Sequence, residues 1–211
     1  MFYFHRTPKL LEWLYPGMVW HMDRSKKEVY LTFDDGPVPS ITPDILDILK
    51  EKGVNATFFC VGDNIRKHAA ILERICEEGH AVGNHTYHHI NGWSSSTSVY
   101  CNDVSDCDAI LKNTGIETTL FRPPYGKISR AQASILRDTN KKIIMWDVLT
   151  GDFDTRLSWE TCFKKSIPHI RPGSVIVLHD NPKARARTME LLPPLIDHIR
   201  QLDLKCSAIP F

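Results

Sequence analysis

The chain has 211 residues, and its 26 lysines and arginines against 25 aspartates and glutamates give a formal net charge of +1 at pH 7. A balance so close to neutrality gives no indication of nucleic acid or an acidic membrane surface as a partner. No run approaches the roughly 20 apolar residues of a membrane-spanning helix, so no transmembrane segment is expected. The length suits one domain with a full hydrophobic core.

The first 27 residues form a segment of their own in the pattern of the sequence. The stretch Leu10 to Trp20 is apolar, but Glu12 and Pro16 interrupt it and no small-residue cleavage site follows, so it makes a poor signal peptide. We expect residues 1–27 to be an extension with a short helix that packs on a domain of residues 28–211.

Six cysteines are scattered along the chain without a Cys-x-x-Cys pair. One of them lies in the apolar run TFFCV, where a buried thiol is expected. The spacing suits reduced thiols and a cytoplasmic setting better than a disulfide framework. The cysteines are Cys60, Cys76, Cys101, Cys107, Cys162 and Cys206.

From Glu28 onward, apolar β-rich runs alternate with helix-like stretches. The predicted strands are Glu28–Asp35, Asn55–Gly62, Ala81–His85, Thr119–Pro123, Ile143–Leu149, Ser174–Asp180 and Lys205–Ile209. The predicted helices are Thr42–Lys52, Asn64–Glu78, Ser98–Asn113, Ser129–Thr139, Ser158–Ile170 and Thr188–Leu202. Such alternation predicts a parallel sheet with right-handed crossovers.

Seven strands are one fewer than a complete α/β barrel has, so a barrel that lacks one unit competes with an open doubly wound sheet. In both architectures the functional residues gather at the carboxyl ends of the strands. Unusual polar residues follow five of the seven predicted strands. A shared site at that end of the sheet is therefore expected.

The first predicted strand ends in LTFDDGP, with Asp34 and Asp35 side by side. Adjacent carboxylates repel, and ionised carboxylates are costly to bury unless something compensates them. A solvated Asp-Gly-Pro turn is one interpretation. The other is that a cation and a reaction share the pair, with one aspartate binding the cation and the other accepting a proton from the attacking water. Spacing does not say which aspartate does which.

The third predicted strand ends in NHTYHH, where His85 and His89 are four residues apart. One turn of helix would place both imidazoles on the same side, and with a carboxylate they form a three-ligand set for zinc or a similar divalent ion. His88 could replace His89, although a spacing of four is the better match. The remaining histidines are expected to be packed or solvated, and they include His5, His21, His68, His80, His169 and His198.

In the run FRPPYG, two prolines without N–H groups make Tyr125 the first backbone donor after Arg122. Stiff chain on either side would fix this N–H as a donor to a developing oxyanion. Arg122 would compensate the aspartate pair. The alternative interpretation is a rigid loop with a surface arginine.

His179 follows the apolar strand SVIVL and is the natural general acid, with Asp152 or Asp147 orienting its ring. The loop NPKARARTM comes next and is expected to be a solvated face, or to contact an anionic glycan. Its basic residues are Lys183, Arg185 and Arg187.

These motifs, in this order, resemble those of the polysaccharide deacetylases, the family 4 carbohydrate esterases with a NodB-homology domain. The match runs from about Glu28 to the C-terminus: TFDDGP is similar to the first motif, HTYHH to the second, RPPYG to the third, WDVLTGDFD to the fourth and VLH to the fifth. The resemblance implies a distorted (β/α)7 barrel. It also implies metal-dependent removal of acetyl groups, usually N-acetyl groups, from the amino sugars of a peptidoglycan- or chitin-like glycan or an intracellular conjugate.

The resemblance implies roles for individual residues as well. The metal ligands it implies, for zinc or for cobalt, nickel or another divalent ion, are Asp35, His85 and His89. The catalytic residues it implies are Asp34 as base, Arg122 as partner of the base, Tyr125 as oxyanion donor, His179 as acid and Asp152 as the residue that tunes the acid. The substrate-binding residues it implies are Tyr125, Phe153 and Leu178, the last as a wall of the acetate-methyl pocket.

The sequence departs from the family pattern at one point, because Phe153 follows Asp152 where the family usually has tryptophan. Most relatives are exported, which favours the cell envelope, whereas no export signal is evident here. One alternative is a related metal-dependent hydrolase of a small amide or ureide. Another is a catalytically inactive carbohydrate-binding module, which predicts a lost base, acid or ligand, and none is missing. A purely structural metal protein fits less well, because such sites are normally closed by four protein ligands.

Overall fold

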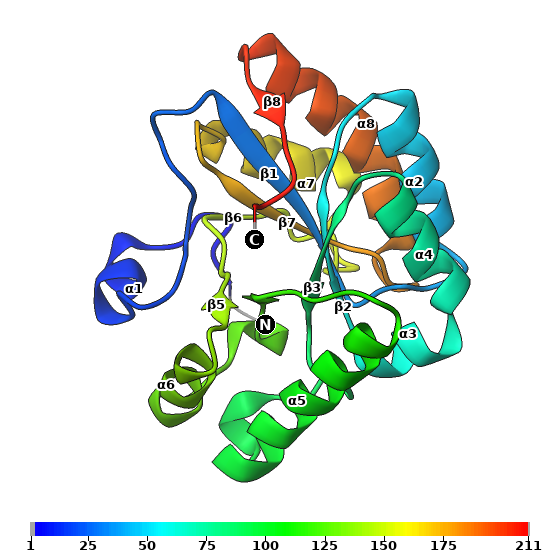
Figure 1. The fold of residues 1–211 in the computed structure, drawn as a ribbon. Coiled ribbons are helices and arrows are strands. Elements are labelled where there is room, and N and C mark those ends of the chain that lie inside the picture. Colours follow the sequence, from blue (N-terminus) through cyan, green and yellow to red (C-terminus); the bar gives the residue numbers. More distant parts are fainter. Residues whose placement is uncertain (1–2, 211) are drawn as a thin grey trace.

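The computed structural model describes residues 3–210, and its strands form one parallel sheet that curls on itself (Figure 1). The order is β5-β4-β3-β2-β1-β7-β6, and β8 pairs with the start of β1. The strands are β1 Glu28–Asp34, β2 Thr57–Cys60, β3 Ala81–Asn84, β4 Leu120–Phe121, β5 Lys142–Ile143, β6 Val148–Leu149, β7 Val175–His179 and β8 Lys205–Cys206.

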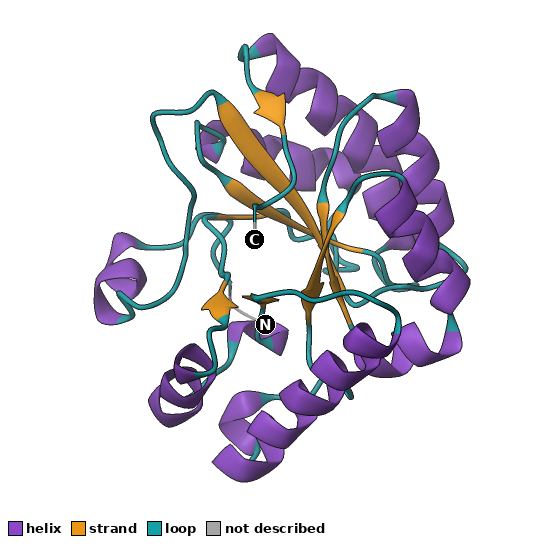
Figure 2. Ribbon diagram, in the orientation of Figure 1, coloured by secondary structure: helices purple, strands orange, loops and turns teal. Residues whose placement is uncertain are grey.

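Helices cover the outside of the curled sheet (Figure 2). The helices are α1 Lys9–Leu14, α2 Thr42–Glu51, α3 Gly62–Lys67, α4 Ala69–Glu77, α5 Thr97–Asn113, α6 Arg130–Asp138, α7 Trp159–Ser166 and α8 Arg185–Gln201, with short 3₁₀ turns η1 Gly92–Ser94, η2 Pro124–Gly126 and η3 Ile167–His169. The predicted parallel α/β architecture and the distorted barrel are confirmed.

Each strand divides its side chains between two faces, because successive residues point in opposite directions. In β1, Phe33 packs into the main core between the sheet and the helices. Tyr30, three residues earlier in β1, faces the inside of the curled sheet, together with Phe59 of β2 and Ile209 near the C-terminus. Polar residues that face the inside at the carboxyl ends of the strands therefore come close to one another.

The prediction of one strand over Ile143–Leu149 is wrong. The structure has two short strands there, β5 and β6, at opposite ends of the sheet. The N-terminal segment lies between them, because Val19 forms a parallel bridge to Ile144 and Arg6 forms an antiparallel bridge to Val148. Several backbone N–H and C=O groups of residues 143–149 form hydrogen bonds with N-terminal residues and not with a neighbouring strand. The N-terminal residues thereby connect the two ends of the curled sheet.

Part of the N-terminal segment is buried against the rest of the chain. Met18 and Trp20 belong to a core cluster with Tyr100 of α5 and Leu136 of α6. Helix α1, by contrast, buries none of its residues. Residues 1 and 2 of the expected extension, and residue 211 at the end of the expected domain, lie outside the described residues.

Two predicted helices are interrupted. The helix expected over Asn64–Glu78 is divided into α3 and α4 at His68, whose φ of −135° is not helical. The helix expected over Ser158–Ile170 gives way to η3 one residue before Pro168, which has no N–H for a helical hydrogen bond.

Two further findings concern the helices and the cysteines. Within residues 3–210, no helix is long and apolar enough to span a membrane. All six cysteines are free, and four of them are buried, namely Cys60, Cys107, Cys162 and Cys206.

Candidate active site

The carboxyl ends of five strands bring the predicted site residues to one end of the curled sheet, namely β1, β3, β4, β6 and β7. Strands β1 and β7 are in register so that Asp34 lies beside His179. The N–H of His85 donates to the carbonyl of Cys60 at 3.0 Å, and the N–H of Arg122 donates to the carbonyl of Asn84 at 3.0 Å. Backbone hydrogen bonds of the sheet thus fix the positions of the Cα atoms from which these functional side chains extend.

The adjacent aspartates point to different partners because the strand ends between them. Asp34 is the last residue of β1, whereas Asp35 has a φ of 91°, in the left-handed region. The carbonyl of Asp35 accepts a hydrogen bond from Asn64 Nδ2 at 2.7 Å, which holds this unusual turn. One carboxylate therefore faces Arg122 and the other faces the histidines.

Asp180 supports the same turn from behind and was not singled out by the sequence. Its Oδ1 accepts the Gly36 N–H at 2.8 Å, and its Oδ2 accepts the Thr42 hydroxyl at 2.7 Å. A Cβ at Gly36 would lie 1.8 Å from Asp180 Oδ2, so this position requires glycine. Burial raises the pKa of the Asp180 carboxyl well above its ordinary value.

A candidate cation site is formed by Asp35, His85 and His89, whose ligand atoms all lie within 4.8 Å of one another. Asp35 Oδ1 is 2.9 Å from His89 Nε2 and 3.6 Å from His85 Nε2. His85 Nδ1 donates to the carbonyl of Arg122 at 2.7 Å, which leaves Nε2 directed at the carboxylate. Burial opposes ionisation of Asp35, but the two imidazoles hold the pKa of its carboxyl well below its ordinary value.

This donor set fits a divalent cation. Two imidazole nitrogens and one carboxylate oxygen match the three-ligand sites that leave positions open for water and substrate. His88 lies outside this cluster, because its Nδ1 is 2.6 Å from Asp103 Oδ2 and its side chain is largely exposed. Of the two histidines that the sequence left open, the structure brings His89 to the cluster.

Arg122 is fully buried beneath the site, so the interpretation of a surface arginine is wrong. Its Nη1 donates to Asp34 Oδ1 and to Thr32 Oγ1, both at 2.7 Å. Its Nε and Nη2 donate at 3.1 Å to the carbonyls of Ile144 and Met145. Burial lowers the pKa of Arg122, and the charge of Asp34 opposes that shift. The four hydrogen bonds fix the guanidinium and, through it, the Asp34 carboxylate.

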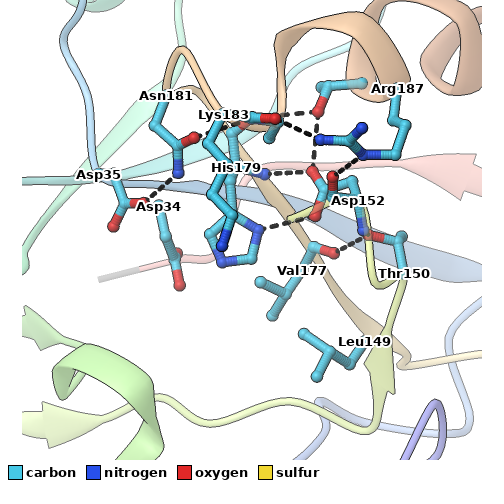
Figure 3. A network of polar contacts seen from close by, with 12 residues as sticks. Asp34, Asp35, Leu149, Thr150, Asp152, Val177, His179, Asn181, Lys183 and Arg187 are labelled. Atoms are coloured by element: carbon cyan, nitrogen blue, oxygen red, sulfur yellow. Dashed lines mark hydrogen bonds and ion pairs between the residues drawn. The ribbon is translucent and has the colours of Figure 1, made fainter. Parts of the chain in front are cut away.

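His179 is paired with Asp152, and Figure 3 shows this network. His179 Nδ1 is 2.8 Å from Asp152 Oδ1, and Asp152 Oδ2 accepts both the His179 N–H and the Thr188 hydroxyl. Burial would lower the pKa of His179, but attraction to Asp152 and the hydrogen bond between them outweigh burial and raise it to about 9. His179 is therefore an imidazolium at neutral pH.

Asp147, the other candidate partner, lies at the opposite end of β7. Its Oδ1 accepts the N–H of Val175, the first residue of that strand, and its Oδ2 forms a 2.7 Å ion pair with Arg24. Burial raises the pKa of Asp147, and Arg24 opposes that shift. The structure thus brings Asp152, and not Asp147, to His179.

The expectation that Leu178 lines the acetyl pocket is wrong. Leu178 precedes His179 in β7, so its side chain points to the other face and packs in the core between sheet and helices. Val177 shares the inner face with His179 and is the register partner of Leu149 in β6. Figure 3 shows Val177 and Leu149 on the His179 side of the site.

Two aromatic rings border the site. The Phe153 ring centroid is 5.2 Å from that of His179, and the Tyr125 ring centroid is 4.7 Å from that of His89. Tyr125 has a φ of 60°, so the backbone turns sharply where its N–H was expected to serve as a donor. Burial raises the pKa of the Tyr125 phenol.

Asn181 contacts the cation site and was missed by the sequence reasoning. Its Nδ2 donates to Asp35 Oδ2 at 2.5 Å, and its Oδ1 accepts the Ala184 N–H at 2.9 Å, just before α8 (Figure 3). An asparagine two residues after His179 and shortly before a helix was the available signal. The basic loop expected after His179 ends earlier than predicted, because Arg185 and Arg187 lie in the first turn of α8. Arg187 donates to the carbonyl of Asp152, and Arg185 pairs with Asp44 at 2.6 Å.

The site unites a candidate cation cluster, a carboxylate held by a buried arginine and a protonated imidazole at the carboxyl ends of parallel strands. A cation beside a proton acceptor and a proton donor is the equipment of a metal-dependent hydrolase. This is the class of protein that the fold and the site define.

Comparison with known proteins gives the family. A family model described as polysaccharide deacetylase matches residues 21–144. A peptidoglycan-N-acetylglucosamine deacetylase of Bacillus cereus is 36% identical over 188 residues, which are 88% of this chain and 68% of the relative. The chain belongs to the polysaccharide deacetylase family, as its motifs predict.

Solved structures agree with this assignment. The crystal structure of the Bc1960 peptidoglycan N-acetylglucosamine deacetylase, in complex with 4-naphthalen-1-yl-N-oxidanyl-benzamide, has a TM-score of 0.90 and 33% identity, and the match covers 97% of this chain and 95% of that one. A family 4 pseudoenzyme from Bacillus anthracis has a TM-score of 0.81 and 26% identity, and the match covers 90% of this chain and 66% of that one. The fold of the family therefore occurs with and without activity, so function has to be argued from the site.

Proposed function

We propose that this protein is a metal-dependent deacetylase that hydrolyses the N-acetyl groups of amino sugars in a peptidoglycan- or chitin-like glycan. One observation carries the proposal. Two aspartates adjacent in sequence have separate partners, with Asp34 held by Arg122 and Asp35 placed among two imidazoles. Cation binding and proton abstraction need different carboxylates. Asp35 is thus available for the cation and Asp34 for the proton.

Asp35, His85 and His89 are the residues that hold the cation, with zinc the best match and cobalt or nickel able to serve. A divalent cation bound there supplies Lewis acidity, which polarises the acetyl carbonyl and lowers the pKa of the attacking water. Asn181 orients the Asp35 carboxylate toward the histidines by its hydrogen bond to Oδ2.

Asp34 accepts the proton of the attacking water as the new carbon–oxygen bond forms, and Arg122 fixes the orientation of this base. The Tyr125 N–H donates to the developing oxyanion. His179 then gives its proton to the leaving nitrogen as the carbon–nitrogen bond breaks, releasing acetate and a free amino sugar. Asp152 orients His179 and keeps it protonated.

The walls of the site suit an acetyl group on a sugar. Val177 and Leu149 provide an apolar surface beside His179, where the acetyl methyl is expected to lie. Phe153 takes the place of the usual tryptophan and presents its ring to His179. We further propose that residues 28–211 are the catalytic domain and that residues 1–27 pack on it as an extension.

The first experiment measures acetate release from N-acetylglucosamine oligomers and from peptidoglycan, using enzyme stripped of metal and enzyme reloaded with zinc, cobalt or nickel. Chelation is expected to abolish activity, and reloading to restore it. Asp35→Asn should weaken metal binding, with partial recovery of turnover in excess metal. Asp34→Asn should keep its metal and lose a factor of about 10²–10⁴ in kcat.

The same assays contain the results that would contradict the proposal. Full activity in metal-free enzyme would exclude the cation from the reaction. If Asp34→Asn lost its metal and Asp35→Asn kept it, Asp34 would be the metal ligand and Asp35 the base. Hydrolysis of a ureide panel without acetate release from any glycan would identify the related small-amide hydrolase. Bound metal without any hydrolysis would identify an inactive carbohydrate-binding module.

A further inference from the structure

The guanidinium of Arg122, which holds the proposed base, is itself held by the backbone of a distant part of the chain. Arg122 is fully buried, and a buried charge is stable only when its hydrogen-bonding groups are paired. Asp34 pairs with Nη1, whereas Nε and Nη2 donate at 3.1 Å to the carbonyls of Ile144 and Met145. The orientation of the Asp34 carboxylate therefore depends on where these two carbonyls lie.

The two carbonyls belong to residues 144–146, which lie between β5 and β6. The Ile144 N–H donates to the carbonyl of Phe121 in β4 at 2.8 Å, and the Asp147 N–H donates to the carbonyl of Val175 in β7 at 3.2 Å. Between these two hydrogen bonds the chain crosses from one end of the curled sheet to the other. Support for the carbonyls in this crossing comes from the N-terminal segment.

Val19 of the N-terminal segment holds the first part of the crossing. Its N–H donates to the carbonyl of Ile143 at 2.8 Å, and its carbonyl accepts the N–H of Met145 at 2.7 Å. These two hydrogen bonds lie on either side of Ile144, the residue with which Val19 forms a parallel bridge. The peptide groups that carry the two carbonyls are thus fixed on one side.

Thr7 of the same segment holds the second part. Its buried hydroxyl donates to the carbonyl of Trp146 at 2.7 Å, and its N–H donates to the carbonyl of Asp147 at 3.1 Å. The Trp146 carbonyl lies one planar peptide group after that of Met145, so the hydrogen bond to one limits the rotation of the other. The Trp146 ring also contributes, because its centroid is 5.9 Å from Arg122 Cζ.

The cation cluster is held by other parts of the chain. The Asp35 carbonyl accepts a hydrogen bond from Asn64 of α3, and its Oδ2 accepts one from Asn181 before α8. The N–H of His85 donates to the carbonyl of Cys60 in β2. A disturbance of the N-terminal segment should therefore reach the base and leave the cation in place.

We infer that the N-terminal segment positions the catalytic base, and that Thr7 is a positioning residue that acts on Asp34 through residues 144–146 and Arg122. The inference rests on the proposed function, because it concerns the base of that reaction. A displacement of a reacting group by about 1 Å can cost about 10²-fold in rate. Since the base serves every substrate, the loss should be the same for large and small ones.

The test removes one hydroxyl. Thr7→Val loses the donor to the Trp146 carbonyl and keeps the shape of the side chain, whereas Thr7→Ser keeps the donor. Thr114→Val is the matched control, because the Thr114 hydroxyl also donates to a backbone carbonyl, that of Leu111, at 2.7 Å at the end of α5. The substrates are an N-acetylglucosamine tetramer and 4-nitrophenyl acetate. Thermal unfolding establishes that each variant is folded at the assay temperature.

Thr7→Val should lower kcat by about 3- to 10-fold on both substrates with KM unchanged, as expected when an interaction made only in the transition state is weakened. Thr7→Ser should retain the kcat of the parent enzyme, and Thr114→Val should match the parent throughout. Bound metal should stay at one equivalent per chain in all variants, because the cation ligands are held elsewhere.

A double variant tests whether Thr7 acts through Arg122. Arg122→Lys keeps a cation beside Asp34 but lacks the guanidinium donors to the carbonyls of Ile144 and Met145. In this background, Thr7→Val should lower kcat less than about twofold further, because the group that it positions is absent.

Four results would overturn the inference. A loss on the tetramer alone would mean that Thr7 acts on the substrate and not on the base. Loss of metal together with kcat would mean that the segment supports the whole site. No loss in Thr7→Val, or the same loss in Thr7→Ser, would exclude the hydroxyl. The full loss repeated in the Arg122→Lys background would exclude the path through the guanidinium. Failure of the proposed function is distinct from all four, because the parent enzyme would then release no acetate from any glycan.

Discussion

The end of β7 and the loop after β3 each carry a histidine paired with an aspartate, and only the surroundings differ. His179 Nδ1 is 2.8 Å from Asp152, and His88 Nδ1 is 2.6 Å from Asp103. The side chain of His179 is 16% exposed, whereas that of His88 is 63% exposed. The contact itself is the same in both places.

In each aspartate, the carboxylate oxygen that does not contact the histidine ring accepts other hydrogen bonds, and these differ between the two. Asp152 Oδ2 accepts the backbone N–H of its own histidine and the hydroxyl of Thr188. Asp103 Oδ1 accepts the backbone N–H groups of Tyr87 and His88, so it holds the shape of the loop that presents His89. The same histidine–carboxylate contact thus serves a proton donor at the site in one case and the shape of a loop in the other, and for His179 the attraction of Asp152 and of the nearby aspartates outweighs burial.

The largest expected effect separates the two histidines. His179→Ala removes the proton donor and should lower kcat for glycan deacetylation by about 10²–10⁴. His88→Ala removes an exposed ring and should leave kcat unchanged. Steady-state acetate release by both variants, each loaded with one equivalent of metal, makes the comparison. Equal losses in the two variants would mean that the environment does not distinguish the pairs.

A smaller effect concerns the pH dependence that Asp152 imposes. The pKa of His179 is raised to about 9, so the imidazolium donor is present below this pH and lost above it. Asp152→Asn removes the anion that favours the charged ring, so the alkaline limb of kcat/KM should move downward. If the pKa of His179 returned to its ordinary value of 6.5, the protonated fraction of His179, and with it kcat/KM, would fall roughly 30-fold at pH 8.

Asp103→Asn is the control for this measurement, since it changes the other aspartate in the same way. Its pH profile should overlay that of the parent enzyme. If the alkaline limb stays in place in Asp152→Asn, or moves equally in both variants, the partnership of Asp152 and His179 is not the origin of the limb.

The smallest effect on activity is expected at the loop after β3. Asp103→Ala removes the acceptor of the His88 N–H, whereas the Tyr87 N–H keeps the Asp103 carbonyl as a second acceptor. The change should reduce the free energy of unfolding by about 1–3 kcal/mol. Denaturant unfolding measures this, with Asp106→Ala on an exposed face of α5 as the control. Turnover at saturating metal should change little. A variant as stable as Asp106→Ala would show that the loop does not depend on Asp103.

The sequence by itself determined the chemical groups and their order along the chain. Alternation of apolar runs predicted parallel strands, and polar residues at five strand ends predicted a shared site, because carboxyl ends of parallel strands meet at one edge. The spacing of His85 and His89 and the twin aspartates predicted a cation site. These are local patterns, and the motifs that carry them were sufficient to identify the family.

Only the tertiary structure decided which neighbours these groups have. The residue pattern left both Asp147 and Asp152 open as partners of His179, and only the family resemblance implied Asp152. In the structure the two aspartates contact opposite ends of β7. It offered Leu178 as a wall, but the alternation of side chains across the strand puts Val177 on the inner face. Both outcomes depend on the register between strands that are far apart in the sequence.

The N-terminal segment shows the same limit on a larger scale. Its composition predicts an extension that packs on the domain, but it does not predict that the segment lies between β5 and β6. The run 143–149 reads as a single strand because all of its residues except Asp147 are apolar. It divides because several of its backbone hydrogen bonds go to Val19, Thr7 and His5, more than a hundred positions away, and no local pattern contains that information.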